Sequence, residues 1–166
     1  MRGPNQIDVK RADVNVTPAD LLGAPAGEIT EGGIRNNIKV GVQYIESWLR
    51  GNGCVPLYGL MEDAATAEIC RAQLWQWIHA NTPTDYGVPV SAALVTRMLR
   101  EELDVLSETG ALDEDAARLF GQARTLLTVL LTERTCPEFL TLPAYLRHLS
   151  GGSGTPTSVE QAPVAA

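Results

Sequence analysis

From about residue 32 onward, hydrophobic residues recur every three or four positions, which is the spacing of amphipathic helices. The first such run ends at Gly51, and two later runs begin after the potential cap residues Ser91 and Asp113. The pattern therefore predicts three amphipathic helices. Their apolar positions are Ile34, Ile38, Val42, Ile45 and Leu49 in the first, Leu94, Val95, Met98, Leu99, Leu103 and Leu106 in the second, and Ala116, Phe120, Ala123, Leu127 and Leu130 in the third.

A further helix is predicted over about residues 64–80, after a loop with the sequence GNGCVPLYG, and this helix is apolar nearly all round. A helix of that kind is usually central and buried. We expect Trp75 and Trp77 to lie in the core. The apolar residues are Ala67, Cys70, Leu74 and Trp77 on one side, and Ala65, Ile69 and Ala72 on the other.

The two ends of the chain differ from this helical middle. Residues 1–31 predict an extended arm with one short helix start at TPAD (17–20), and a last short helical piece is predicted over about 137–149. Residues 150–166 have the composition of a disordered tail. The predicted fold class is all-α: a bundle of about five helices in one domain, residues 32–149, between the arm and the tail.

Composition narrows the possible partners. The 166 residues are 45% hydrophobic and carry a net charge of −7, which argues against nucleic acid and against an anionic membrane surface. Three cysteines without CxxC spacing and two histidines assemble no zinc site, so no metal is expected on this chain. No signal peptide and no apolar run near 20 residues is visible, so cytoplasm is the expected location.

Asp63 stands at the predicted start of the 64–80 helix and allows two interpretations. It can cap the helix, since Asp is among the best N-cap residues. It can also be a general base, because a capping carboxylate is held in one orientation, as a base must be. Glu62 is interpreted as a solvated loop acid and Glu68 as a residue on the helix face. A nucleophilic Cys54 is disfavoured, because neither histidine is placed by sequence to activate it.

The run GGIRNNIKVGVQYIESWLRGNGCVPLYGLMEDAATAEICRAQLWQWIH resembles the C-terminal domain of malate synthase, in the shorter of its two isoforms. The similarity extends back through PNQIDVKR and forward through FLTLPAYL, covering about residues 4–149. LMEDAATAEI with the preceding GNGC is its most specific part.

The resemblance implies an enzyme of the glyoxylate cycle that condenses acetyl-CoA with glyoxylate and hydrolyses the product to malate and CoA. It implies that a TIM barrel binds Mg²⁺ and glyoxylate, while the C-terminal helical domain covers the barrel. It further implies that the aspartate of the MED sequence, Asp63 here, is the catalytic base. Met61 and Cys54 are then expected in the wall of the acetyl-CoA channel.

The barrel, with its metal carboxylates and its glyoxylate arginine, has no counterpart in these 166 residues. We therefore expect this chain to correspond to roughly the last third of a malate synthase and to be inactive alone. The alternative is a helical interaction module that docks on a separate barrel or another protein. In that case Asp63 matters only as a helix cap.

Overall fold

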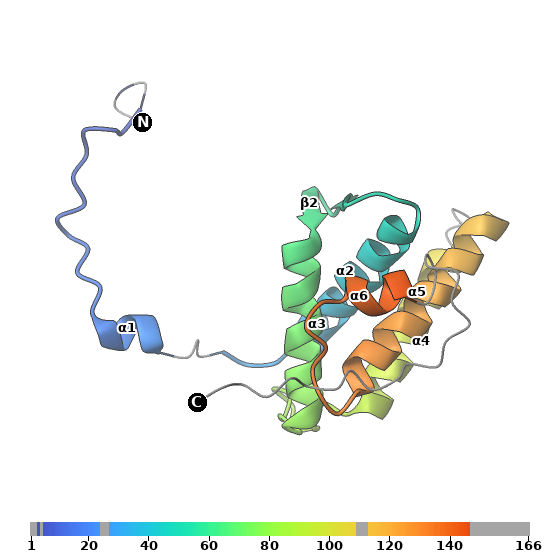
Figure 1. The fold of residues 1–166 in the computed structure, drawn as a ribbon. Coiled ribbons are helices and arrows are strands. Elements are labelled where there is room, and N and C mark those ends of the chain that lie inside the picture. Colours follow the sequence, from blue (N-terminus) through green and yellow to red (C-terminus); the bar gives the residue numbers. More distant parts are fainter. Residues whose placement is uncertain (1–2, 4, 24–26, 109–112, 147–166) are drawn as a thin grey trace, which may run out of the picture.

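The computed structural model describes residues 3, 5–23, 27–108 and 113–146, and it confirms the predicted all-α fold class with one addition, a small hairpin. Figure 1 shows the long helices packed side by side, with the hairpin at one end of α3. The elements are α1 (Pro18–Leu22), α2 (Glu31–Leu49), β1 (Cys54–Leu57), β2 (Leu60–Asp63), α3 (Ala64–His79), α4 (Ala92–Glu108), α5 (Glu114–Thr132) and α6 (Thr141–Ala144).

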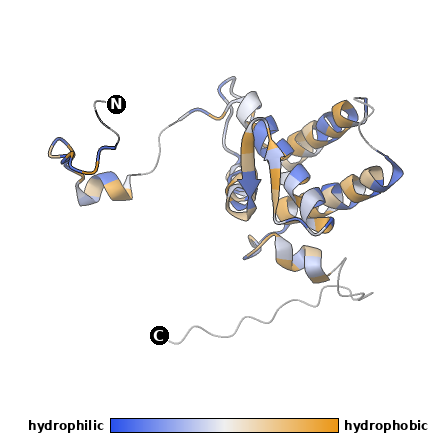
Figure 2. Cartoon of the chain, turned by 90° about the horizontal axis from the view of Figure 1, so that it is seen from above, coloured by the Kyte–Doolittle hydropathy of each residue, from blue (hydrophilic) through white to orange (hydrophobic). Residues whose placement is uncertain are grey.

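Helix α2 is the central element of the bundle. It packs against α3, α4 and α5, and it buries apolar residues on more than one side, among them Ile34, Val40 and Tyr44. The expectation that the 64–80 helix is central and buried is therefore wrong. Helix α3 has one face on α2 and α5 and leaves its other side in solvent, with Ile69 59% exposed. In Figure 2 the long helices carry hydrophobic and hydrophilic residues side by side, as amphipathic helices do.

Side-chain caps begin α4 and α5 as the sequence predicts. The hydroxyl of Ser91 accepts the backbone N–H of Leu94 at 3.2 Å in α4, and a carboxylate oxygen of Asp113 accepts that of Ala116 at 2.7 Å in α5. Both caps satisfy donors that a helix start leaves without a partner. The boundaries of the predicted helices are thus set by local hydrogen bonds as well as by packing.

Residues 54–63, expected to be loop as far as residue 59, form an antiparallel hairpin instead. The strands join through a two-residue turn at Tyr58 and Gly59, whose φ angles are +52° and +82°. Two positive φ angles are typical of the turn that suits the twist of a hairpin. Hydrogen-bonded and non-hydrogen-bonded pairs alternate away from such a turn, which places Pro56 and Met61 in a non-hydrogen-bonded pair. The missing N–H of Pro56 therefore costs no ladder bond.

The N-terminal arm lies apart from the helices. Residues 5–23 are exposed throughout and lead away from the bundle (Figure 1). The capping box predicted at 17–20 is present, because Thr17 and Asp20 exchange side-chain and backbone bonds at the start of α1. The last helix, α6, is shorter than the predicted 137–149 piece; residues 147–149 and the predicted tail, 150–166, lie outside the described residues. Among the described residues, no helix has the length and apolar character needed to cross a membrane.

Candidate active site

Asp63 is both the last residue of β2 and the N-cap of α3. Its backbone is extended (φ −119°, ψ −173°), a conformation that suits a strand end and an N-cap equally. Its Oδ1 atom accepts the backbone N–H groups of Ala65 at 2.9 Å and Thr66 at 3.1 Å. The predicted cap is therefore confirmed. The carboxylate is exposed, and Oδ2 accepts no hydrogen bond from the described residues.

Cys54 and Met61, the two other predicted site residues, lie on the same face of the hairpin as Asp63. Cys54 is the residue directly opposite Asp63, and Met61 precedes Asp63 by two positions on β2, so the three side chains point the same way. Cys54 and Asp63 form a non-hydrogen-bonded pair, in which opposite Cα atoms approach to about 4.5 Å. Cys54 is exposed, and Met61 is 64% exposed. The structure thus gathers all three on one open face.

The opposite face of the hairpin attaches it to the bundle. Leu57 packs against Val40 of α2 and Cys70 of α3. Glu62 lies on this inner face and is only 9% exposed, so the interpretation of Glu62 as a solvated loop acid is wrong. The physical reason is strand alternation, which turns Glu62 away from the side of Met61 and Asp63. Burial, aided by the charge of Glu62, raises the pKa of the Cys70 thiol to about 11.

A buried ion pair joins α3 to the segment before α6, and sequence analysis missed it. Arg71 is 4% exposed and donates to Glu68 Oε2 from Nε at 2.8 Å and from Nη2 at 2.5 Å. Arg71 Nη1 also donates to Cys136 Sγ at 3.3 Å, while Glu68 Oε1 accepts the N–H of Leu140 at 2.6 Å. Glu68 therefore connects two segments and is more than a helix-face residue. Only the three-residue spacing of Glu68 and Arg71 could have indicated the pair.

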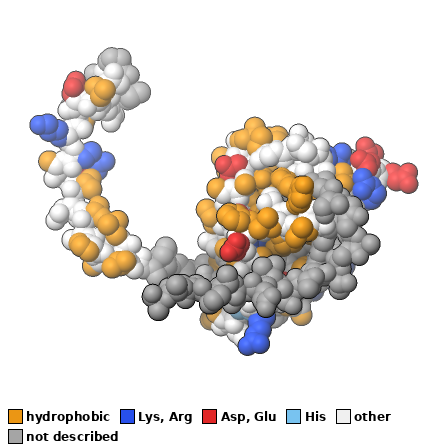
Figure 3. Space-filling model, viewed as in Figure 1, with side chains coloured by type: hydrophobic (Ala, Val, Ile, Leu, Met, Phe, Trp, Pro, Cys, Tyr) orange, Lys and Arg blue, Asp and Glu red, His pale blue; other side chains and the backbone are white. Residues whose placement is uncertain are grey.

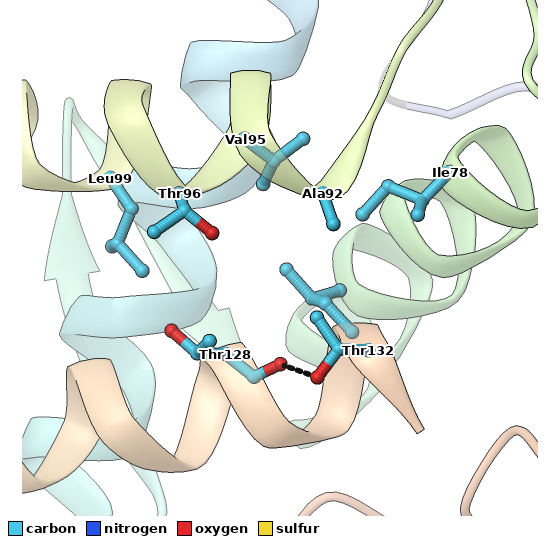
Figure 4. A pocket seen from close by; sticks show the side chains of 8 residues that line it. Ile78, Ala92, Val95, Thr96, Leu99, Thr128 and Thr132 are labelled. Carbon is cyan, nitrogen blue, oxygen red and sulfur yellow. Dashed lines mark hydrogen bonds between the residues drawn. The ribbon is translucent and has the colours of Figure 1, made fainter. Parts of the chain in front are cut away.

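The described residues provide no cluster of metal-binding side chains, and a small cleft lies away from Asp63. Within them, no group of three or more His, Cys, Asp and Glu side chains could hold a metal ion. A cleft between the end of α3 and helices α4 and α5 (Figure 4) has room for about 10 Å³, roughly one water molecule. Its lining includes Ile78, Val95 and Thr128. This cleft is too small for an organic substrate.

Apolar side chains gather on the surface of α3 and α6, as Figure 3 shows. On α3, Ile69 is half or more exposed, as are Leu60 and Met61 on the neighbouring β2. Exposed apolar patches of this kind are typical of interaction sites. Further exposed large hydrophobic residues on the segment around α6 are Phe139, Leu142, Tyr145 and Leu146.

Comparison with known proteins shows the family to which the chain belongs. The model of the family described as "Malate synthase, C-terminal" matches residues 28–148. A malate synthase of Myxococcus xanthus is 51% identical over 145 residues, which are 87% of this chain and 27% of that protein. Malate synthase A of Escherichia coli is 47% identical over 142 residues, 85% of this chain and 27% of that protein.

A third relative is a longer protein, of which this chain covers a smaller share. The "Bifunctional glyoxylate cycle protein" of Caenorhabditis elegans is 44% identical over 153 residues, 92% of this chain and 15% of that protein. The chain thus spans about a quarter of the two bacterial relatives, and less of the nematode protein. Because the family model covers most of the chain, from the start of α2 through α6, the chain belongs to the malate synthase family and carries its C-terminal domain.

Proposed function

We propose that this chain supplies the general base of a malate synthase, which condenses acetyl-CoA with glyoxylate and water to give malate and CoA. The observation that supports this proposal is the exposed carboxylate of Asp63, oriented through Oδ1 by the start of α3. A base has to be fixed in direction and accessible to substrate. The bonds to Oδ1 fix the direction of the Asp63 carboxylate, and its exposure leaves it accessible, which supports the proposal.

In the proposed reaction, Oδ2 of Asp63 takes a proton from the methyl carbon of acetyl-CoA. The electron pair of that C–H bond becomes the enolate, whose carbon then forms a bond to the aldehyde carbon of glyoxylate. The aldehyde oxygen takes up a proton, and water then cleaves the thioester to release CoA and malate. Met61 and Cys54 stand beside Asp63 on the same face, where they can contact the incoming thioester.

We assign the binding of Mg²⁺ and of glyoxylate to a barrel that is not among these 166 residues. The described residues contain no group of three or more His, Cys, Asp and Glu side chains that could hold a metal ion. In the proposal, a TIM barrel binds Mg²⁺ and glyoxylate, and the exposed apolar surface of β2 and α3 lies against that barrel. The chain on its own is then inactive.

A second candidate is a non-catalytic module that docks on a barrel or another protein. The exposed apolar surface around Ile69 and Leu142 favours an interaction role. This alternative predicts the same docking but gives the carboxylate of Asp63 no chemical task. The two proposals therefore predict different activities for Asp63→Asn, which replaces one carboxylate oxygen by an amide nitrogen.

The test uses a malate synthase in which this chain replaces the aligned C-terminal segment of the Myxococcus xanthus relative. Asp63→Asn keeps a capping oxygen but removes the base, so we expect the rate of CoA release to fall at least a thousandfold with assembly intact. Asp113→Asn, at the cap of α5, is the matched control and should keep its activity. Activity within tenfold of the parent after Asp63→Asn excludes the base role and leaves the docking module.

The activity of the chain alone is measured separately. The 166-residue protein is mixed with acetyl-CoA, glyoxylate and Mg²⁺, and thiol release is followed above the blank given by its own cysteines. We expect no release above that blank. Turnover by the chain alone contradicts the assignment of the metal and of glyoxylate binding to another part of the protein.

A further inference from the structure

The position of Asp63 depends on the path of the chain from α2 into β1, because β1 is the only strand that pairs with β2 among the described residues. That connection is short and runs from Arg50 to Gly53. Its residues are exposed, so packing does little to fix its course. Hydrogen bonds from the end of α2 must do so instead.

Ser47 takes part in those hydrogen bonds through its backbone carbonyl and through its hydroxyl. Its backbone carbonyl accepts the N–H of Asn52 at 3.0 Å, while Gly51, with φ +94°, donates its N–H to the carbonyl of Trp48 at 2.8 Å. These two bonds form a Schellman motif, which ends α2 and turns the chain back. The Ser47 hydroxyl then donates to the carbonyl of Cys54 at 3.1 Å, at the first residue of β1. One residue thus binds the connection at Asn52 and the first residue of β1 at Cys54.

The carbonyl that Ser47 binds is the one that the hairpin leaves free. Cys54 and Asp63 are a non-hydrogen-bonded pair, so the Cys54 carbonyl points away from β2 and needs another donor. Ser47 is only 6% exposed, which limits the access of water to its hydroxyl. A buried hydroxyl of the central helix is therefore fixed to the residue directly opposite Asp63.

The other polar side-chain contacts between the described residues of the hairpin and α2 lie at its tip, beside the apolar contact of Leu57 with Val40. Gln43 Nε2 donates to the Tyr58 hydroxyl at 3.0 Å, and Lys39 Nζ lies 5.4 Å from the centre of the Tyr58 ring. These contacts are exposed and at the far end of the strands from Asp63. Losing the Ser47 bond therefore removes the polar contact with α2 at the end of the hairpin that carries the carboxylate, while the contacts at the tip remain.

We propose that Ser47 is a positioning residue for the malate synthase reaction, acting on Asp63 through the backbone of Cys54. The proposal rests on the proposed function of Asp63. Misplacing a reacting group by about 1 Å can cost about a hundredfold in rate. We therefore expect Ser47→Ala to lower kcat by about ten- to a hundredfold, while KM for glyoxylate, which binds to the rest of the enzyme, stays within twofold.

The experiment measures kcat and KM per folded enzyme in the hybrid malate synthase described above. Ser47→Thr keeps a hydroxyl and should restore most of kcat, which a general loss of stability would not explain. Thr84→Val is the matched control, because Thr84 is also buried and its hydroxyl also donates to a backbone carbonyl, that of Val88 at 2.9 Å. Thr84 follows the far end of α3, a helix about 24 Å long, so Thr84→Val should reduce stability without reducing kcat.

A second measurement does not depend on activity. In the 166-residue chain, the amides of Val55 and Glu62 form the ladder pair next to Cys54 and Asp63, and their hydrogen exchange reports on that end of the hairpin. Ser47→Ala should speed their exchange, and Ser47→Thr should not. Unchanged exchange in Ser47→Ala overturns the inference even where the hybrid enzyme fails to fold.

The two proposals fail in different ways. If Asp63→Asn keeps activity, the proposed function fails, whatever the Ser47 variants do. If Asp63→Asn abolishes activity while Ser47→Ala keeps the parental kcat per folded enzyme, the positioning role of Ser47 fails alone. Equal losses of kcat in Ser47→Ala and Thr84→Val also overturn it, since both are then general effects on the domain.

Discussion

Replacing Asp63 by Ala and by Asn separates its capping role from its charge, and the stability of the 166-residue chain measures the difference. Asp63 Oδ1 accepts the N–H groups of Ala65 and Thr66. Ala removes both bonds and the charge. Asn keeps an oxygen acceptor at the same position and removes only the charge, and it is about as good an N-cap as Asp.

The exposure of this helix start decides the expected size of the effect. Loss of an N-cap costs about 0.5–2 kcal/mol. Ala64 and Ala65 are exposed, so water can replace the lost acceptor, and we expect Asp63→Ala to cost about 1 kcal/mol. That is a fall in Tm of roughly 3–5 °C for a domain of this size. Asp63→Asn loses only the attraction between the carboxylate and the helix dipole, about 0.3–1 kcal/mol.

Urea unfolding followed by circular dichroism at 222 nm gives the free energies directly. Asp113 is the matched control, because it caps α5 through Ala116. Both caps should show the same order, with Ala costing more than Asn. The reasoning is refuted if Asp63→Asn destabilises the chain as much as Asp63→Ala, or if Asp63→Ala has no effect while Asp113→Ala has one.

Two further predictions concern the hairpin and its surroundings. Exposed Cys54 should be alkylated rapidly by iodoacetamide at pH 8, while Cys70, which is buried and has its pKa raised to about 11, should react only on unfolding. Mass spectrometry of peptides distinguishes the two cysteines, and rapid labelling of Cys70 contradicts its burial. Because folding keeps that thiol protonated, its contribution to stability should fall as pH rises from about 9 to 11, and Cys70→Ala should reduce this loss in urea titrations at each pH. Gly59→Ala, at φ +82° with open space around it, should cost about 1 kcal/mol through the backbone alone, whereas Gly53→Ala, without a positive φ, should be neutral or stabilising; equal effects argue against the turn geometry.

The helices could be predicted because their signals are local. The three- and four-residue spacing of apolar positions gave α2, α4 and α5, and short-range bonds such as those of Ser91 and Asp113 set where α4 and α5 begin. Asp63 as a cap was predictable for the same reason. Each of these features depends on residues within one or two helical turns.

The hairpin could not be predicted from the same kind of signal. Its strands are only four residues long, and Pro56 in the middle of one argues against a strand. Its turn places Tyr58 at a position where Asn or Gly is typical. The register makes Pro56 harmless, but that register is set by the turn at Tyr58 and Gly59, which its residue types do not clearly signal. The burial of Glu62 follows from the same register and was missed with it.

The wrong expectation for α3 also has a physical origin. Sequence shows that Ala67 and Leu74 on one side and Ile69 on the other are apolar, but it does not show which of them meet the bundle. In this structure Ala67 and Leu74 are fully buried, while Ile69 is 59% exposed. Burying a side chain such as Ile69 stabilises an assembly by about 1.5–3 kcal/mol. The apolar outer side of α3 would therefore stabilise an assembly in which another domain or protein covers it.

Asp63 lies at the start of α3, so its position in the proposed enzyme depends on what the two sides of this helix contact. The inner side, with Leu74, joins the helix to α2, whose Ser47 also fixes the strand opposite Asp63. The outer side, with Ile69, is exposed and is the side that we propose lies against a barrel. A carboxylate at the N-cap of such a helix is held by the bundle and lies close to the proposed interface. In the hybrid enzyme, the barrel should shield both the outer side of α3 and Asp63 from water. If it shields the outer side but leaves Asp63 as exposed as in the chain alone, α3 serves docking only and the proposed delivery of a base is wrong.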